Sequence, residues 1–167
     1  MKRSTLGLVA GAAILLTTAT SADHHEGPQG EVQRLHKMVS DVSAERIKTD
    51  ITKLVGFGTR HTLSETKSET RGIGAARRWI EAEFKRIAEG CEADLEVYTV
   101  SDVVSGARIP NPTEVVSVIA VQRGILDPDR VVIMSGDIDS RVSDPLDGTS
   151  DSPGANDNAS GMAGTIE

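Results

Sequence analysis

The chain has 167 residues and a formal net charge of −7, with 38% hydrophobic and only 2% aromatic residues. This length suits one domain or part of one, and the acidic balance argues against a nucleic-acid partner, which requires a basic surface. A single cysteine, Cys91, excludes an internal disulfide, so the fold depends on its apolar core or on a bound metal.

Residues 1–22 are typical of a secretory signal peptide. Lys2 and Arg3 precede an apolar run over residues 6–16, and small residues follow as far as Ala22. Because this run is shorter than the roughly 20 residues that a transmembrane helix requires, we expect an exported protein, periplasmic or secreted, with no membrane span in the mature chain. Residues 23–30 are expected to form a flexible polar linker.

Three segments show the spacing of three and four residues that indicates amphipathic helices. The first begins near Val32 and keeps its apolar residues on one face as far as Val42. The second follows Ser43, which is a predicted N-cap. The third extends over residues 72–90 and ends at a glycine. A loop with two glycines, residues 54–62, separates the second and third helices.

Strand-like segments follow the helices. Residues 95–100 and 114–122 are rich in β-branched side chains, and a loop that contains Pro110 and Pro112 is expected between them. The run RVVIMSGD, residues 130–137, is short and nearly continuously apolar. Such a run is typical of an interior strand covered on both faces.

The order of these elements predicts an α/β fold. We expect a three-layer α/β/α arrangement with a mixed sheet, preceded by amino-terminal helices and incomplete at its carboxyl-terminal side. Residues 140–154 are expected to form a solvated loop, and residues 159–167 to begin a helix. Because two turns without a C-cap end a helix poorly, we expect the sequence to be a truncated or partial one.

Three aspartates stand where an α/β protein places its chemistry. Asp137 and Asp139 follow the apolar run, and Asp157 lies in a glycine-flanked loop before the last helix. Carboxylates suit a hard or borderline divalent metal. Aspartate also favours turns because of its local hydrogen bonds, so the pattern alone leaves solvated loops as the alternative to a metal site.

The strings that surround these aspartates resemble a known family. SPGANDNASG (152–161), preceded by the D-x-D-S turn, resembles the co-catalytic zinc aminopeptidases, whose relatives include glutamate carboxypeptidase-like enzymes and glutaminyl cyclases. LVGFGTRHT (54–62) and RGIGAARRWIEAEF (71–84) resemble the amino-terminal region of that family. The resemblance implies that residues 31–167 are the amino-terminal part of a zinc-exopeptidase-like domain.

The resemblance also implies roles for the three aspartates and two zinc ions in the complete protein. Asp157 matches the aspartate that bridges the metals, and Asp139 matches the carboxylate that orients a metal-bound histidine and takes part in the site. Asp137 stands where the family has that histidine, which implies either a preference for harder ions or a weakened first metal site. His61 matches no ligand of the family, and we expect it to be structural.

The activity that the resemblance implies is hydrolysis of peptide or amino-acyl substrates by a metal-activated water. The general base and distal ligands of the family lie downstream of the helix that follows Asp157, and Glu167 is interpreted as an ordinary helix residue. We therefore expect the 167-residue chain itself to be inactive. Two alternatives stay open: a non-catalytic relative that serves as a binding domain, and an acyl transferase of the glutaminyl cyclase type.

Overall fold

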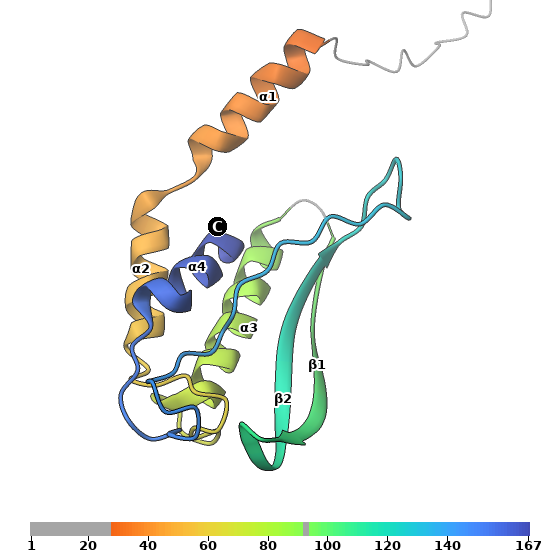
Figure 1. Ribbon diagram of the computed structural model, residues 1–167. Helices are drawn as coiled ribbons and strands as arrows, with labels where there is room; N and C mark the ends of the chain where they lie inside the picture. The colour runs from red at the N-terminus through yellow and green to blue at the C-terminus, as the bar shows by residue number, and fades with distance from the viewer. Residues whose placement is uncertain (1–27, 92–93) are drawn as a thin grey trace, which may run out of the picture. The chain divides into compact units, whose positions relative to one another are not determined.

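The computed structural model describes residues 28–91 and 94–167, so the predicted signal peptide lies outside the described residues. The first helix, α1 (Pro28–Asp41), confirms the helix expected near Val32 and begins within the last residues of the predicted linker (Figure 1). Its apolar side chains, Leu35 and Val39 among them, are exposed. The spacing of the apolar residues therefore predicts this helix correctly.

Helix α2 (Ala44–Val55) begins where the sequence predicts it. Ser43 has extended backbone, and its hydroxyl accepts a hydrogen bond of 3.2 Å from the Arg46 N–H. This cap satisfies one of the amide groups that a helix leaves unpaired at its amino terminus. At the other end of α2, Leu54 is fully buried and joins the core.

Helix α3 (Gly72–Gly90) confirms the third predicted helix at both ends. Its apolar stripe, which includes Ala76, Ile80 and Phe84, is buried in the core. Trp79 is partly buried against the same core, with its ring centroid 6.4 Å from that of Phe57. The helical spacing of apolar residues therefore identified the face that packs inward.

The two strands β1 (Leu95–Gly106) and β2 (Ile109–Gln122) pair in an antiparallel sheet, with Leu95 opposite Gln122. Val97, Val118 and Ala120 share one face and pack against the core. The two strands lie beside α3 (Figure 1). Alternate side chains point to opposite faces of a strand. On the other face Tyr98 and Val100 are exposed, whereas Ile119 and Val121 are half-buried.

Pro110 and Pro112 lie within β2, so the prediction that they belong to a loop is wrong. A strand in a two-stranded sheet has one free edge, where a backbone N–H needs no partner. The ladder is also irregular at this point. Its register shifts between Val104, opposite Thr113, and Gly106, opposite Ile109, so both prolines lie in the shifted stretch of β2.

The prediction that residues 130–137 form an interior strand is also wrong. This segment is extended but has no strand partner among residues 28–91 and 94–167, and Val132 is 88% exposed. An interior strand needs a backbone ladder on both sides, and the described sheet contains β1 and β2 alone. Apolar composition indicated a buried strand, but pairing decides whether a strand forms.

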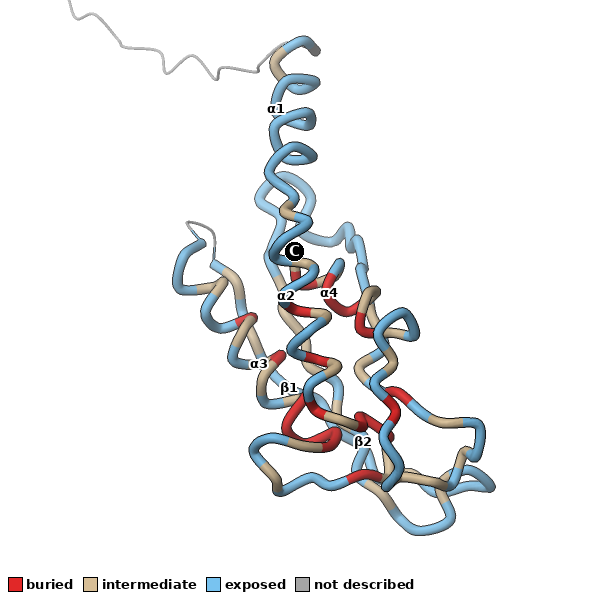
Figure 2. Tube along the Cα trace, turned by 90° about the vertical axis from the view of Figure 1, so that its left-hand side faces the viewer, coloured by how far each residue is buried: buried red, intermediate tan, exposed pale blue. Residues whose placement is uncertain are grey.

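The last elements are an irregular turn, η1 (Ala155–Ala159), in which Asp157 and Asn158 depart from helical backbone angles, and helix α4 (Ser160–Ile166), which confirms the predicted helix start. Ala159, Met162 and Ile166 join the core formed with α2 and α3. Figure 2 shows the buried residues on α2, α3, α4 and the loops between them. The α/β class is confirmed in an incomplete form: helices with a two-stranded sheet.

Within the described part of the chain, no helix combines the length and the hydropathy needed to cross a membrane.

Candidate functional site

The two loops that carry the predicted site residues lie against each other. The Ser140 hydroxyl donates a hydrogen bond of 2.6 Å to the Ser152 carbonyl oxygen, and both side chains are buried. A Cβ atom placed on Gly154 would lie 2.6 Å from the Ser140 Cβ atom, and one on Gly136 would lie 2.6 Å from the Met162 Cα atom. Loop 136–140 therefore packs closely on η1 and α4.

A third segment joins these two loops. The backbone at Thr59 and Ser152 forms a parallel bridge, and the Ser152 N–H donates to the Gly58 carbonyl oxygen at 2.9 Å. The hydroxyl oxygens of Thr59 and Ser152 are 3.0 Å apart, and the Ser140 hydroxyl is 3.2 Å from that of Ser152. The loop after α2 is thus hydrogen-bonded through backbone and hydroxyl groups to the two aspartate loops, residues 136–140 and 152–157.

Arg60 completes this connection. Its side chain is fully buried, and its guanidinium donates to backbone carbonyl oxygens in both aspartate loops and at the end of α2. Burial lowers the Arg60 pKa, and the nearby negative charge of Asp139 acts in the opposite direction. No sequence pattern indicated this role for Arg60, although the residue belongs to the string LVGFGTRHT, which resembles the amino-terminal region of the family.

The side chains of Asp137, Asp139 and Asp157 are exposed. None of them forms a hydrogen bond or ion pair with another described residue, so all three carboxylates are available to a ligand. Asp157 lies in extended backbone within η1, and its peptide bond to Asn158 is cis. The structure therefore places free carboxylate oxygens on two adjoining loops.

These carboxylates fit a zinc ion in chemistry but do not fill its coordination shell. Zinc takes oxygen ligands from aspartate and is almost always bound by three or four protein groups. Among residues 28–91 and 94–167, no three His, Cys, Asp or Glu side chains lie close enough together to hold a metal ion. The described loops can contribute part of a metal site, and further donors would have to complete it.

His61 has the structural role that the sequence predicted. Its side chain is buried, and its Nδ1 atom accepts a hydrogen bond of 3.0 Å from the Leu63 N–H. The His61 N–H donates in turn to the Thr59 hydroxyl at 3.2 Å. This imidazole holds the turn after Arg60 and is not directed at the aspartate loops by any of its hydrogen bonds.

Glu167 is more than an ordinary helix residue, so that interpretation is corrected. Its side chain is buried, and one carboxylate oxygen accepts a hydrogen bond of 2.7 Å from the Ser43 N–H. The other lies 3.0 Å from the Arg46 Nε atom. The negative charge therefore stands at the amino terminus of α2, where the helix dipole favours an anion.

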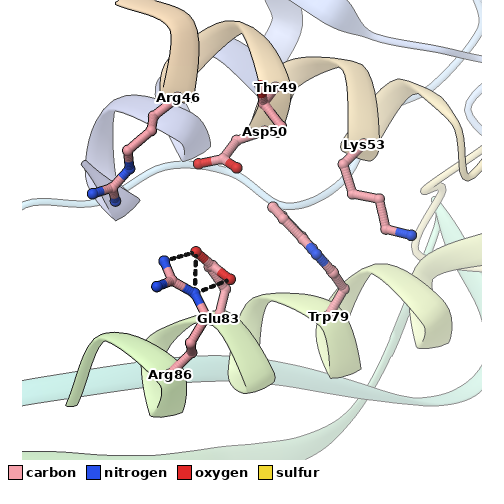
Figure 3. Close-up of a pocket in the computed structure, with 7 residues that line it drawn as sticks. All are labelled: Arg46, Thr49, Asp50, Lys53, Trp79, Glu83 and Arg86. Atoms are coloured by element: carbon pink, nitrogen blue, oxygen red, sulfur yellow. Dashed lines mark hydrogen bonds and ion pairs between the residues drawn. The ribbon is translucent and has the colours of Figure 1, made fainter. Parts of the chain in front are cut away.

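A separate open cavity of about 410 Å³ lies between α2 and α3 (Figure 3). Asp50 is buried beside it, and its Oδ2 atom has no hydrogen-bond partner among the described residues. Burial raises the Asp50 pKa, and the negative charges of Glu83 and Glu167 raise it further. Glu83 is itself paired with Arg86. The cavity is lined by Arg46, Thr49, Asp50, Lys53, Trp79, Glu83 and Arg86.

The fold and the loops together define an incomplete α/β protein with exposed carboxylates on two loops locked together by a buried arginine. Among known proteins, the chain is similar to a "probable zinc metalloprotease" of Leptosphaeria maculans, with 51% identity over 84% of this chain. It is 50% identical over 84% of its length to a protein of the same description in Pyrenophora teres f. teres. A third such relative, in Pyricularia oryzae, is 47% identical over 80% of this chain.

The matched region is about a third of each relative or less. The chain covers 32% of the Leptosphaeria protein, 29% of the Pyrenophora protein and 27% of the Pyricularia protein. No family model matches the chain, and no solved structure matches it. The similarity therefore supports a zinc metallopeptidase as the broad class, and it leaves the finer assignment to a proposal.

Proposed function

We propose that this chain supplies the amino-terminal part of the catalytic domain of an exported zinc exopeptidase of the aminopeptidase type. The observation that carries the proposal is the packing of loop 136–140 against loop 152–157, which places free carboxylates on adjoining loops. The similarity to proteins described as probable zinc metalloproteases supports the same reaction class. The basic and apolar pattern of residues 1–22 supports export.

In this proposal Asp157 and Asp137 hold metal, and Asp139 orients a neighbouring ligand. Asp157 is presented by the turn that follows Gly154, whose carbonyl oxygen accepts a hydrogen bond from Arg60. Asp139 follows Ile138, whose carbonyl oxygen is held by the same guanidinium. Bound zinc, with two ions expected, supplies Lewis-acid chemistry for peptide-bond hydrolysis. The substrate is a peptide or amino-acyl compound.

Metal binding and activity can be tested together in the protein expressed from its complete reading frame. We expect the purified protein to contain zinc and to release the amino-terminal residue from amino-acyl p-nitroanilides, with activity lost in excess chelator and restored by zinc. Asp157→Asn should abolish both zinc retention and hydrolysis, because an amide is a poorer ligand than a carboxylate.

The matched control is Asp144→Asn. Asp144 is an exposed aspartate of the same acidic stretch, and the only hydrogen bond of its side chain among the described residues, accepted from the Leu146 N–H, can be kept by an asparagine oxygen. We expect this variant to keep its zinc and its activity. A full-length protein that holds no zinc and hydrolyses no amino-acyl substrate would exclude the proposal.

A second candidate function, a non-catalytic binding domain, is favoured by one feature: aspartate at position 137 in place of the histidine implied by the family resemblance. Asp137→His distinguishes the two candidates. A gain of tight zinc binding in the full-length protein would indicate a metal site that the natural sequence has lost. Unchanged zinc content would indicate that the aspartate is a ligand in its own right.

A further inference from the structure

Arg60 gathers backbone carbonyl groups from three segments that are distant in sequence. Its Nε atom donates to the Ile138 carbonyl oxygen at 2.9 Å, and its Nη2 atom donates to that of Gly154 at 3.0 Å. Its Nη1 atom donates to the carbonyl oxygens of Leu54 at 2.9 Å and Pro153 at 2.8 Å. One planar group therefore connects the end of α2 with both aspartate loops.

The backbone of Arg60 adds a second attachment to the same loops. Its N–H donates to the Ser140 hydroxyl at 3.0 Å, and its carbonyl oxygen accepts from the Ser140 N–H at 3.4 Å. The same Ser140 hydroxyl donates to the Ser152 carbonyl oxygen. Neither loop can slide along the other without breaking several of these bonds.

Burying a guanidinium in the core is unfavourable in free energy. Burying a charge carries a large desolvation cost unless a counter-charge compensates it, and Arg60 forms no ion pair with any carboxylate among the described residues. The negative charge of Asp139 acts on it electrostatically, without a hydrogen bond between the two side chains. The positive charge thus lies beneath loops that carry several free negative charges, where it reduces their mutual repulsion.

The planar geometry of the Arg60 guanidinium also constrains the loops. A guanidinium has five N–H donors in a fixed plane, so the acceptors that it binds are fixed relative to one another. Ile138 stands between Asp137 and Asp139, and Gly154 stands three residues before Asp157. Fixing these two carbonyl groups therefore fixes the spacing between the loops that present the carboxylates.

We propose that Arg60 is the positioning residue of the metal site: its guanidinium sets the distance between the Asp137–Asp139 loop and the Asp157 loop and so determines the affinity for a divalent metal. This inference rests on the proposed function, because it assumes that these loops bind metal. Arg60 touches neither metal nor substrate in this role and acts through the two loops.

The test uses Arg60→Lys and Arg71→Lys in the protein expressed from its complete reading frame. Lysine keeps the charge at position 60 but cannot bind four carbonyl oxygens in one plane. Arg71 is the matched control, because it also holds the long loop, through the Thr149 carbonyl oxygen at 2.9 Å and Asp151 at 2.6 Å, but it is exposed and contacts neither aspartate loop through a hydrogen bond.

The readouts are the zinc dissociation constant, measured by competition with a chromophoric chelator, and the visible spectrum of the cobalt-loaded protein. We expect Arg60→Lys to weaken zinc binding by about 10- to 100-fold, the range found when groups that orient metal ligands are removed. The cobalt bands should change in position or intensity, since they report ligand geometry. Arg71→Lys should leave both readouts unchanged.

Each outcome separates the inference from the function on which it rests. A wild-type protein without zinc contradicts the proposed function. A wild-type protein that binds zinc, with a folded Arg60→Lys variant of the same zinc affinity and cobalt spectrum, overturns the positioning role and leaves the function standing. A fall in the melting temperature of the metal-free variant with unchanged zinc affinity has the same meaning.

A second variant covers the case in which Arg60→Lys does not fold. Arg60→Gln replaces the guanidinium with a neutral amide that has two N–H donors in place of five, so it buries no charge but cannot hold all four carbonyl oxygens together. We expect it to weaken zinc binding by about tenfold, at the lower end of the same range. Unchanged zinc affinity in this variant would overturn the inference.

Discussion

Replacing Gly154 with alanine tests how tightly the aspartate loops are packed. Gly154 has φ +48° and ψ +48°, in the left-handed region. For a residue with a Cβ atom this region costs about 1–2 kcal/mol. The new Cβ atom would also lie 2.5 Å from the Asp157 carbonyl oxygen and 2.6 Å from the Ser140 Cβ atom. Overpacking of this kind typically costs about 1–3 kcal/mol.

Together these contributions predict that Gly154→Ala lowers the free energy of unfolding by roughly 2–5 kcal/mol. The measurement is urea denaturation of both proteins, followed by circular dichroism at 222 nm. Because folded domains are stable by only about 5–15 kcal/mol, such a loss of stability would clearly lower the urea concentration at the midpoint of unfolding. The carbonyl oxygen of Gly154 also accepts a hydrogen bond from Arg60, so the substitution disturbs the hydrogen bonds of the Arg60 guanidinium as well.

Gly164→Ala is the matched control for this substitution. Gly164 lies within α4, and a Cβ atom placed on it meets nothing within 4 Å. Alanine is favoured over glycine in a helix by about 1 kcal/mol, so we expect unchanged or slightly increased stability. A Gly154→Ala protein within about 0.5 kcal/mol of the wild type, the range of an ordinary surface substitution, would refute the close packing of these loops.

Three further predictions concern the core, a buried carboxylate and a helix cap. Ile80→Ala should lower the free energy of unfolding by about 2–5 kcal/mol, because it leaves a cavity at a fully buried position. Ile125→Ala, at a position 96% exposed, should change this free energy by at most about 0.5 kcal/mol. Equal effects of the two substitutions in denaturation would contradict the assigned core. Burial and two neighbouring glutamates raise the pKa of Asp50 above its ordinary 3.8, so the folded state holds this proton more strongly than the unfolded state, and the contribution of Asp50 to the free energy of unfolding should fall as the pH rises from 3.8 through the raised pKa. Asp50→Asn should remove that fall and gain stability relative to wild type at pH 7, and parallel stability curves of the two proteins between pH 3 and 7 would count against it. Ser43→Ala should lower the free energy of unfolding by about 1 kcal/mol through loss of the α2 cap, and Ser43→Gly by only a few tenths of a kcal/mol. Thermal unfolding can measure both changes. A larger loss of stability for glycine than for alanine would show that the cap is not the cause.

Local rules predicted the helices well. The Ser43 cap, the buried stripe of α3 through Ile80 and Phe84, and the helix start after Asp157 were all read from short-range spacing and confirmed. Each depends on residues within one or two turns of one another, where propensity, capping and periodicity act together. The same rules located the β-branched parts of β1 and β2 but placed Pro110 and Pro112 outside the sheet.

The candidate site was predictable only in part. The aspartates were found from their loop positions and from strings that resemble a metallopeptidase family, and their roles as ligands stay predictions. Arg60 could not be found in this way, because its importance comes from carbonyl groups contributed by residues 54, 138, 153 and 154. A backbone carbonyl carries no signal in the identity of its residue, so the sequence does not show which arginine will bind it.

The sequence by itself determined the helices of this protein, the face of α3 that is buried and the aspartates that can offer oxygen to a metal. The tertiary structure alone decided that residues 130–137 pair with no strand of the described chain, that two prolines fit in β2, and that a buried guanidinium joins the loops of Asp139 and Asp157. The physical reason is how far apart along the chain the interacting residues lie. Helix formation is decided by neighbours along the chain, whereas strand pairing and the satisfaction of buried hydrogen-bonding groups are decided by partners that only folding brings together.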